Sequence, residues 1–511
     1  MKADNKRQPL TETSGLPEPR AEAAAMEAVT GAGVTETGAD PAVEAGFGAS
    51  RKTETEMKGN EAFLVDPSDK KAVRQSIFRL AGPSLVEMML TNFTQMLSMI
   101  MVGRLSPEAV ATVGLTNQPF FLLLALFSTL NVGTTVIVAR SIGSGRLDEA
   151  DRAAGQAFLL NIVLSVVLIA LSYTFAGDFL RLMGGAEDVV AHGLAYAKLV
   201  FLSLGFTTIS MAFTATLRGA GDTRTPMKIN VVANILVVLI GYPLIYGFAG
   251  FEGIGITGAA AATIIAQFVS MAWVTAVMFS GKYKVRLSFR HLFRIDRAMI
   301  ARIGKIGFPS AIEQIVMRLG MLVFFKVAAS LGTMAIAATQ IAFSIFGLSF
   351  MPGMAFAIAA STLVGQALGA HKPELAERYG WQVRKIGIIV AGAIGVGFIL
   401  FAPQIMLLYT TEPAIIEKGS LSIRIMGFIQ ISQATQFILS GALRGAGDTR
   451  YPLYSTFIGV WGFRVVLSLL FVYGIGMDLY GIWLAAAADQ FVRSFLIMRR
   501  FKKGAWKTVR V

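Results

Sequence analysis

A ten-residue motif that occurs twice constrains the fold of this chain more than any other feature. Residues 217–226 read LRGAGDTRTP, and residues 443–452 repeat nine of these ten residues in the same order. The offset of 226 residues continues without a gap on both sides of the motif, so that Glu87, for example, aligns with Glu313. Charged residues and prolines match as well as small apolar ones, which indicates that the chain contains two copies of one structural unit.

Both copies are too apolar for a soluble protein. Of the 511 residues, 54% are hydrophobic and 15% are charged, whereas soluble domains carry about 25% charged residues. A membrane-spanning helix needs about 20 apolar residues, and each copy contains six such stretches. They cover approximately residues 76–101, 112–139, 155–176, 190–217, 228–249 and 256–280, then 302–328, 338–365, 382–408, 418–443, 455–475 and 479–498. The predicted fold class is therefore an all-α polytopic membrane protein with twelve transmembrane helices.

The loops between these stretches predict the orientation of the helices. Lys and Arg are concentrated in alternate loops, in the segment that joins the copies and at the C-terminal end, and such basic loops face the cytoplasm. Six spans return each copy to the side on which it began, so the copies are parallel repeats about an axis along the membrane normal. We expect a multi-pass inner-membrane protein with cytoplasmic termini, in which an N-lobe and a C-lobe surround a central cleft.

These predictions divide the chain into five parts. Residues 1–70 are rich in Ala, Glu, Gly, Thr and Pro and are expected to form a disordered cytoplasmic tail. Residues 71–281 form the N-lobe with helices 1–6, and residues 302–498 form the C-lobe with helices 7–12. A basic cytoplasmic linker, 282–301, joins the lobes, and a basic cytoplasmic tail, 499–511, follows them.

Composition argues against several classes of function. The chain has no cysteine and three scattered histidines, so no metal site is expected. It has no GxxxxGK[ST] nucleotide-binding loop, and the spans lack the clustered His, Asp or Cys of a membrane-embedded enzyme. Membrane orientation explains the basic residues better than a nucleic acid partner does. We expect a monomeric transporter rather than an enzyme, without a cofactor, which moves small organic molecules across the lipid bilayer by using an ion gradient.

Two carboxylates inside predicted spans are candidates for coupling to that gradient. Glu87 and Glu313 lie in the first and seventh spans, each four residues after a proline. Ionisable groups within the membrane are costly and mark ion or substrate pathways, although each glutamate could also be a hydrated or capping group near a helix end. Arg318 follows Glu313 by five residues where the first copy has Asn92. This difference favours Glu87 as a proton carrier and leaves Glu313 to pair with Arg318 or to bind a cationic group.

Other polar residues of the spans could line the cleft or hydrogen-bond between helices. The predicted substrate-binding residues are Asn92, Gln95, Ser98, Asn117, Gln314, Arg318 and Gln340. Arg464 and Asp489 are expected to form a structural pair.

The repeated motif itself is predicted to be a cytoplasmic turn with a structural role. Its glycines permit a tight reversal, and Asp222 or Thr223 can cap the helix that follows. Arg218 and Arg224 are expected to face the lipid headgroups or to pair with Asp222.

The combination of these features resembles the multidrug and toxic compound extrusion (MATE) family. The resemblance rests on the two six-span halves and on the LRGxGDTRxP turn after spans four and ten. It also rests on MVGRL at residues 101–105, EAVA at residues 108–111 and STLVGQALGA at residues 361–370. Together these matches extend over about residues 75–500.

The resemblance implies antiport, in which H+ or Na+ enters while organic, often cationic, compounds leave the cell. Many members carry an acidic residue in the outer half of the first span, where this chain has Ser98. Some carry further acidic residues in the seventh and tenth spans; here the seventh contains Glu313 and the tenth contains none. The identity of the coupling ion stays open, and the alternative function is a flippase for a lipid-linked saccharide or polyisoprenoid precursor.

Overall fold

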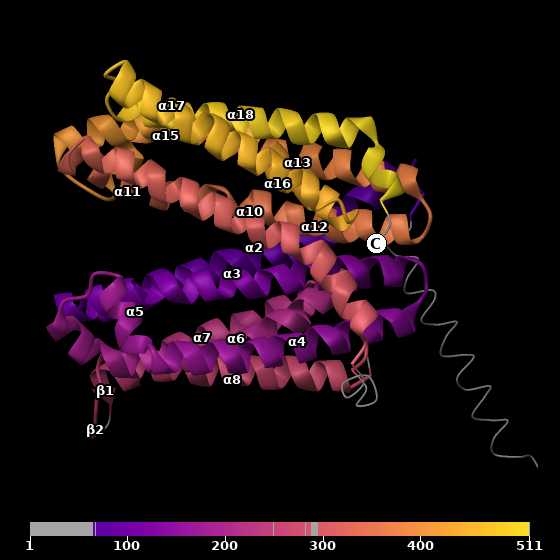
Figure 1. Cartoon of the computed structure of the whole chain (residues 1–511), viewed down its shortest axis with the longest axis horizontal. Coiled ribbons are helices and arrows are strands. Elements are labelled where there is room, and N and C mark those ends of the chain that lie inside the picture. The colour runs from indigo at the N-terminus through magenta and orange to yellow at the C-terminus, as the bar shows by residue number, and fades with distance from the viewer. Residues whose placement is uncertain (1–64, 67, 249, 282, 288–294, 510) are drawn as a thin grey trace, which may run out of the picture. The chain divides into compact units, whose positions relative to one another are not determined.

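The computed structural model describes residues 65–511 except 67, 249, 282, 288–294 and 510. The predicted N-terminal tail thus lies almost entirely outside the described residues, which all belong to one compact unit. This unit is predominantly helical (Figure 1). Among the described residues the only sheet is a two-stranded hairpin, β1 (Gly247–Phe248) paired with β2 (Phe251–Glu252).

The first half of the unit consists of six long helices and one short one. They are α2 (Lys70–Gly103), α3 (Pro107–Gly143), α4 (Leu147–Thr174), the short α5 (Ala176–Leu182), α6 (Glu187–Gly219), α7 (Arg224–Tyr246) and α8 (Ile256–Phe279). We call this set of helices the N-half.

The second half repeats this order with two interruptions. It comprises α10 (Arg297–Ser330), α11 (Thr333–Ser349) followed by α12 (Met351–Gly369), α13 (Pro373–Leu400), the short α14 (Ala402–Leu407) and α15 (Pro413–Gly445). One further span is built from α16 (Arg450–Phe457), the π-helical η2 (Ile458–Val465), α17 (Val466–Leu469) and η3 (Leu470–Gly474). Then come α18 (Leu479–Lys503) and the 3-10 helix η4 (Ala505–Thr508). We call this set the C-half.

Helix boundaries confirm the two-repeat prediction. The pairs α4 and α13, and α6 and α15, begin and end 226 residues apart, and α3 has the same offset from the combined α11 and α12. The same local signals start equivalent helices. Asp69 accepts hydrogen bonds from backbone N–H groups at the start of α2, and Asp296 does so at the start of α10. As a result α10 begins at Arg297, before the predicted start of the seventh span.

Ten of these helical segments are long and apolar enough to cross a membrane. The described helices α10 and α15 are not among the ten, although they have 34 and 33 residues, like their counterparts α2 and α6. Basic residues inside them lower their mean hydropathy: Arg318 and Lys326 in α10, and Lys418 and Arg424 in α15. All twelve predicted helices are present in the expected order.

The two halves pack closely at the helix ends that carry the basic loops, which we call the basic end. There α3 meets α12, and a Cβ atom added to Gly143 would lie 2.0 Å from the carbonyl oxygen of Gln366. At the equivalent position, a Cβ on Gly369 would lie 2.1 Å from the carbonyl oxygen of Arg140. These distances are far below van der Waals contact, so only glycine permits the helices to approach this closely.

We expect Gly143→Ala and Gly369→Ala to lower the free energy of unfolding by about 1–3 kcal/mol each, because the new methyl group overpacks the contact. Gly304→Ala is the matched control, since a Cβ there would meet nothing within 4 Å. The measurement is thermal unfolding of the detergent-purified proteins. Equal melting temperatures for all three variants would contradict the close packing described here.

Candidate functional site

Glu87 lies at a buried junction of three helices in the N-half. Its side chain comes from α2, and the residue is 6% exposed. Arg218 of α6 donates to Glu87 Oε1 from Nη2 at 2.7 Å, and Asn230 of α7 donates to the same oxygen at 2.6 Å. A charge-assisted pair and an amide hydrogen bond therefore connect α2, α6 and α7 at one carboxylate oxygen.

The C-half contains an equivalent junction at Glu313, which is also 6% exposed. Arg444 Nη2 lies 2.8 Å from each carboxylate oxygen, and Thr456 donates to Oε1 at 3.1 Å. These partners lie on α15 and α16, at the offset of 226 residues from Arg218 and Asn230. The repeat has thus conserved the geometry of a buried ion pair within each half.

The two junctions differ in how completely the carboxylate is bonded. Both oxygens of Glu313 accept hydrogen bonds, whereas Glu87 Oε2 is buried and has no hydrogen-bond partner among the described residues. One turn along α2, Thr91 accepts a hydrogen bond from Asn234 of α7 at 3.2 Å. The equivalent residues of the C-half are apolar, Met317 and Val460. The polar contact between these helices therefore extends further in the N-half.

These contacts correct two expectations. Arg218 of the repeated motif does not face headgroups or bind Asp222; like its counterpart Arg444, it turns inward and pairs with the glutamate of its own half. Arg224 is exposed, as expected. The expectation that Glu313 pairs with Arg318 is also wrong, because Arg318 is exposed and Glu313 forms its ion pair with Arg444. The shared offset of glutamate and arginine was a signal that the two residues belong to one junction. Asp222 does cap α7 as expected, by accepting from two backbone N–H groups at 3.0 Å.

The motif also connects the two halves. Thr362 of α12 donates to the carbonyl oxygen of Arg218 at 3.0 Å, and Gln366 donates to that of Gly219 at 2.9 Å. In the opposite direction, Arg140 of α3 donates to the carbonyl oxygen of Ala446 at 2.8 Å. Each copy of the motif therefore provides backbone acceptors to the opposite half at the basic end.

The linker lies beside the first copy of the motif. Burial lowers the pKa of Lys284, the nearby Arg79 lowers it further, and Asp222 opposes both effects. The lowered pKa shows that desolvation of the Lys284 ammonium outweighs its attraction to the carboxylate of Asp222.

Of the predicted substrate-binding residues, Gln95, Gln314, Arg318 and Gln340 are exposed, and Asn92, Ser98 and Asn117 are partly buried. Asn92 donates to the carbonyl oxygen of Met88 in its own helix. The structure does not join these seven residues into one hydrogen-bonded group, because no bond between them is found in the described residues. They stay candidates for contact with a ligand.

A second buried ion cluster lies in the C-half. Arg464 of η2 and Arg493 of α18 lie 2.6 Å and 2.8 Å from the oxygens of Asp489, and all three residues are buried. The expected pair of Arg464 and Asp489 is confirmed, and Arg493 is an additional partner four residues along α18. The N-half has no equivalent, because residues Val238, Thr263 and Gln267 occupy the matching positions.

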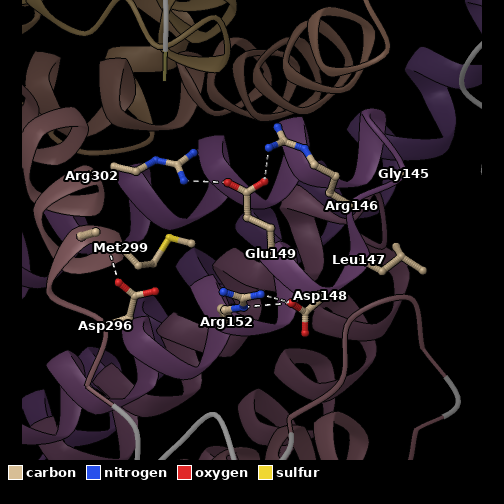
Figure 2. Close-up of a pocket in the computed structure, with 10 residues that line it drawn as sticks. Gly145, Arg146, Leu147, Asp148, Glu149, Arg152, Asp296, Met299 and Arg302 are labelled. Carbon is tan, nitrogen blue, oxygen red and sulfur yellow. Dashed lines mark hydrogen bonds and ion pairs between the residues drawn. The ribbon is translucent and has the colours of Figure 1, made fainter.

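A cavity of about 650 Å³ opens at the basic end, between the starts of α4 and α10. Figure 2 shows that most of its charged side chains are bound to one another, whereas Asp296 accepts a hydrogen bond from the backbone N–H of Met299. Arg146 and Arg302 lie 2.8 Å and 2.6 Å from the carboxylate of Glu149, and Arg152 pairs with Asp148. Because these charges already have partners, the cavity is not the preferred place for ion coupling. No cluster of potential metal ligands was found in the described residues.

Comparison with known proteins gives the class of the molecule. Residues 83–243 and 309–470, one stretch in each half, match the model of the MatE family. The chain belongs to the MatE family. It is 32% identical to the probable multidrug resistance protein NorM of Thermotoga maritima, over 85% of this chain and 93% of that protein.

Two further similarities agree with this. The chain is 27% identical to the uncharacterized transporter YisQ of Bacillus subtilis, over 87% of this chain and 96% of that protein. Its fold matches the structure of a MOP superfamily transporter from Pyrococcus furiosus, with a TM-score of 0.82 and 24% identity over 88% of this chain and 99% of that one. The resemblance inferred from the motif and the repeat is confirmed.

The charge balance of the second ion cluster gives a test of the structure. We expect Asp489→Asn to cost about 3–5 kcal/mol of stability, because it leaves two buried arginines without a counter-charge. Arg493→Gln introduces the residue found in the N-half and leaves a one-to-one pair, so its cost should be about 1–2 kcal/mol. Thermal unfolding of the two purified variants measures the difference, and the opposite order of stabilities would refute this charge assignment.

Proposed function

We propose that this protein is a multidrug efflux transporter that exports small organic molecules across the inner membrane in exchange for protons, and that Glu87 carries the proton. The observation that carries this proposal is the buried Oε2 of Glu87, which has no partner among the described residues, beside an Oε1 bound by Arg218. The relatives named multidrug resistance proteins support export as the direction of transport.

A proton fits this site for two reasons. An unpaired buried oxygen is costly, and protonation of Oε2 removes the charge that makes its desolvation expensive. A sodium ion would instead lie close to the guanidinium of Arg218 and the amide donor of Asn230, which repel a cation. Proton coupling is therefore favoured over sodium coupling.

Protonation would be transmitted to the basic end through Arg218. When Glu87 becomes neutral, its ion pair with Arg218 weakens, and the arginine is left partly buried without a counter-charge. The carbonyl oxygen of that same residue accepts the hydrogen bond from Thr362 in the C-half. Movement of Arg218 therefore disturbs the contact that closes the halves at the basic end, which we assign to the cytoplasmic side.

Glu313 has a related but weaker role in this proposal. Its two oxygens are both bonded to Arg444, so its charged form is better stabilised than that of Glu87. It supports the opposite contact, in which Arg140 binds the motif of the C-half. We assign it to the same coupling as a second carboxylate. The transporter is proposed to work as a monomer without a cofactor.

Exchange measurements in proteoliposomes test the role of Glu87. We expect Glu87→Gln to reduce export driven by a pH gradient by about a hundredfold, a typical loss when a proton-transferring group is removed. Downhill exchange of substrate should continue, because such exchange needs no net movement of protons. Glu313→Gln should retain part of the coupled rate, and the exposed Glu108→Gln is the control. Unchanged pH-driven export by Glu87→Gln, or export driven only by sodium, would reject the proposal.

The link from Glu87 to the basic end can be followed with one introduced cysteine, since the chain contains none. Thr362 is fully buried, so Thr362→Cys should react slowly with a hydrophilic maleimide at neutral pH. At acidic pH we expect the labelling rate, divided by that of a fully exposed cysteine at the same pH, to rise about tenfold, corresponding to about 1.4 kcal/mol in the opening equilibrium. The division removes the effect of pH on the thiolate fraction, which sets the rate of reaction with maleimide. Adding Glu87→Gln should make this normalised rate independent of pH. A pH dependence that persists in the double variant would show that another group controls the opening.

A further inference from the structure

The carboxylates in the middle of the described helices are all paired. Only Glu87, Glu313 and Asp489 lie at least ten residues from both ends of their helices, and each is bound by one or two arginines. By contrast, Arg318 lies in the middle of α10, is exposed, and has no ion pair or hydrogen bond of its side chain among the described residues. Arg318 is therefore a positive charge in the middle of a described helix without a neutralising partner among the described residues.

Helical register places Arg318 on the face of α10 that contacts the N-half. It follows Gly307 by eleven residues, which is three turns of an α-helix, so the two share a face of α10. Gly307 contacts α3, because a Cβ there would lie 2.2 Å from the carbonyl oxygen of Thr129. Arg318 thus lies on the face between the halves, about 16 Å further from the basic end at 1.5 Å per residue.

The surface of α2 that faces the C-half is mostly apolar. Phe78 packs edge-on against Phe356 of α12, with ring centroids 6.5 Å apart. Met89 follows Phe78 by eleven residues and Met96 follows by eighteen, so both lie close to the same face of α2. Both side chains are exposed. Asn92, the equivalent of Arg318, lies between them on this face.

The second ion cluster adds positive charge behind Arg318. It combines two buried arginines with one buried aspartate, and its arginines contact α10 one residue before and three residues after Arg318. Arg493 Nη1 lies 4.0 Å from the sulfur of Met317, and Arg464 Nη1 lies 3.3 Å from that of Met321. A net positive charge in a low-dielectric surrounding raises the potential on the near side of this helix. The N-half has only neutral residues at the matching positions.

We propose that Arg318 binds the anionic head of amphiphilic substrates, a carboxylate, sulfonate or phosphate, while Met89 and Met96 contact the apolar part. The inference rests on the proposed transport function and narrows its substrates to anionic and zwitterionic amphiphiles. An exclusively cationic compound would find no unpaired mid-membrane carboxylate among the described residues and would be repelled by Arg318. A guanidinium binds such oxyanions through two parallel hydrogen bonds, and methionine adapts to varied apolar shapes.

The test uses three naphthalene dyes that differ in one group: a sulfonate, its neutral sulfonamide and a trimethylammonium analogue. Binding to the full-length protein in detergent should be about tenfold tighter for the sulfonate than for the ammonium dye. Arg318→Gln should weaken sulfonate binding by about tenfold and leave sulfonamide binding unchanged. Arg318→Glu should reverse the charge preference. Lys326→Gln is the matched control, because Lys326 is an exposed cation of the same helix about a quarter turn away.

Melting temperatures of all variants confirm that binding is compared between folded proteins. A preference for the ammonium dye in the wild type, or sulfonate binding that Arg318→Gln leaves unchanged, would overturn the inference. The proposed function would survive this result if the ammonium dye were exported under a pH gradient in a Glu87-dependent manner.

Transport measurements in proteoliposomes that contain a fluorescent polyisoprenyl phosphate decide whether the anionic head belongs to a soluble compound or to a lipid. Arg318-dependent export of the soluble sulfonate supports a soluble anionic substrate. Arg318-dependent transfer of the phospholipid between leaflets supports the inference with a lipid as the anion. Transport of either probe without dependence on Arg318 would count against it.

Discussion

The buried pair between a glutamate and the motif arginine determines how the first helices of each half are held. Removing a carboxylate and a guanidinium from water costs on the order of several kcal/mol per ion. Only close geometry and additional hydrogen-bond donors offset this cost. Asn230 supplies the additional donor to Glu87 and Thr456 supplies it to Glu313. The arrangement of three helices in each half consequently depends on the charge of one side chain.

The repeated motif places this charge next to the contact between the halves. The side chain of Arg218 turns into its own half, while its carbonyl oxygen and that of Gly219 accept hydrogen bonds from α12 of the other half. A change in the charge of Glu87 therefore reaches the contact between the two halves through a single residue, Arg218. Close packing of backbones at Gly143 and Gly369 makes that interface sensitive to small displacements.

The halves share a frame but differ in charge. Within the described part of the chain, the N-half leaves one oxygen of Glu87 unbonded and continues the polar contact at Thr91. The C-half bonds both oxygens of Glu313 and adds a buried cluster with two arginines and one aspartate. An antiporter must handle an ion and a substrate in one cycle, and this division gives each half a distinct electrostatic character.

Much of this organisation could be predicted from the sequence, for physical reasons. A span must be long and apolar, a helix start needs a cap, and a duplicated gene keeps its register, so the twelve helices and the two repeats were visible in the sequence, as was the position of Glu87 and Glu313 inside helices. The bonding partners were not. Arg218 lies 131 residues from Glu87, and nothing local distinguishes an arginine that faces headgroups from one that turns inward.

Sequence alone determined the architecture and the family, because hydropathy and register are properties of the chain read in order. Only the tertiary structure decided which charges neutralise one another and which are left free. That outcome depends on distances between helices far apart in sequence, and on desolvation that exists only once those helices have packed. The oxygen of Glu87 and the guanidinium of Arg318 that have no partner among the described residues are both results of this kind.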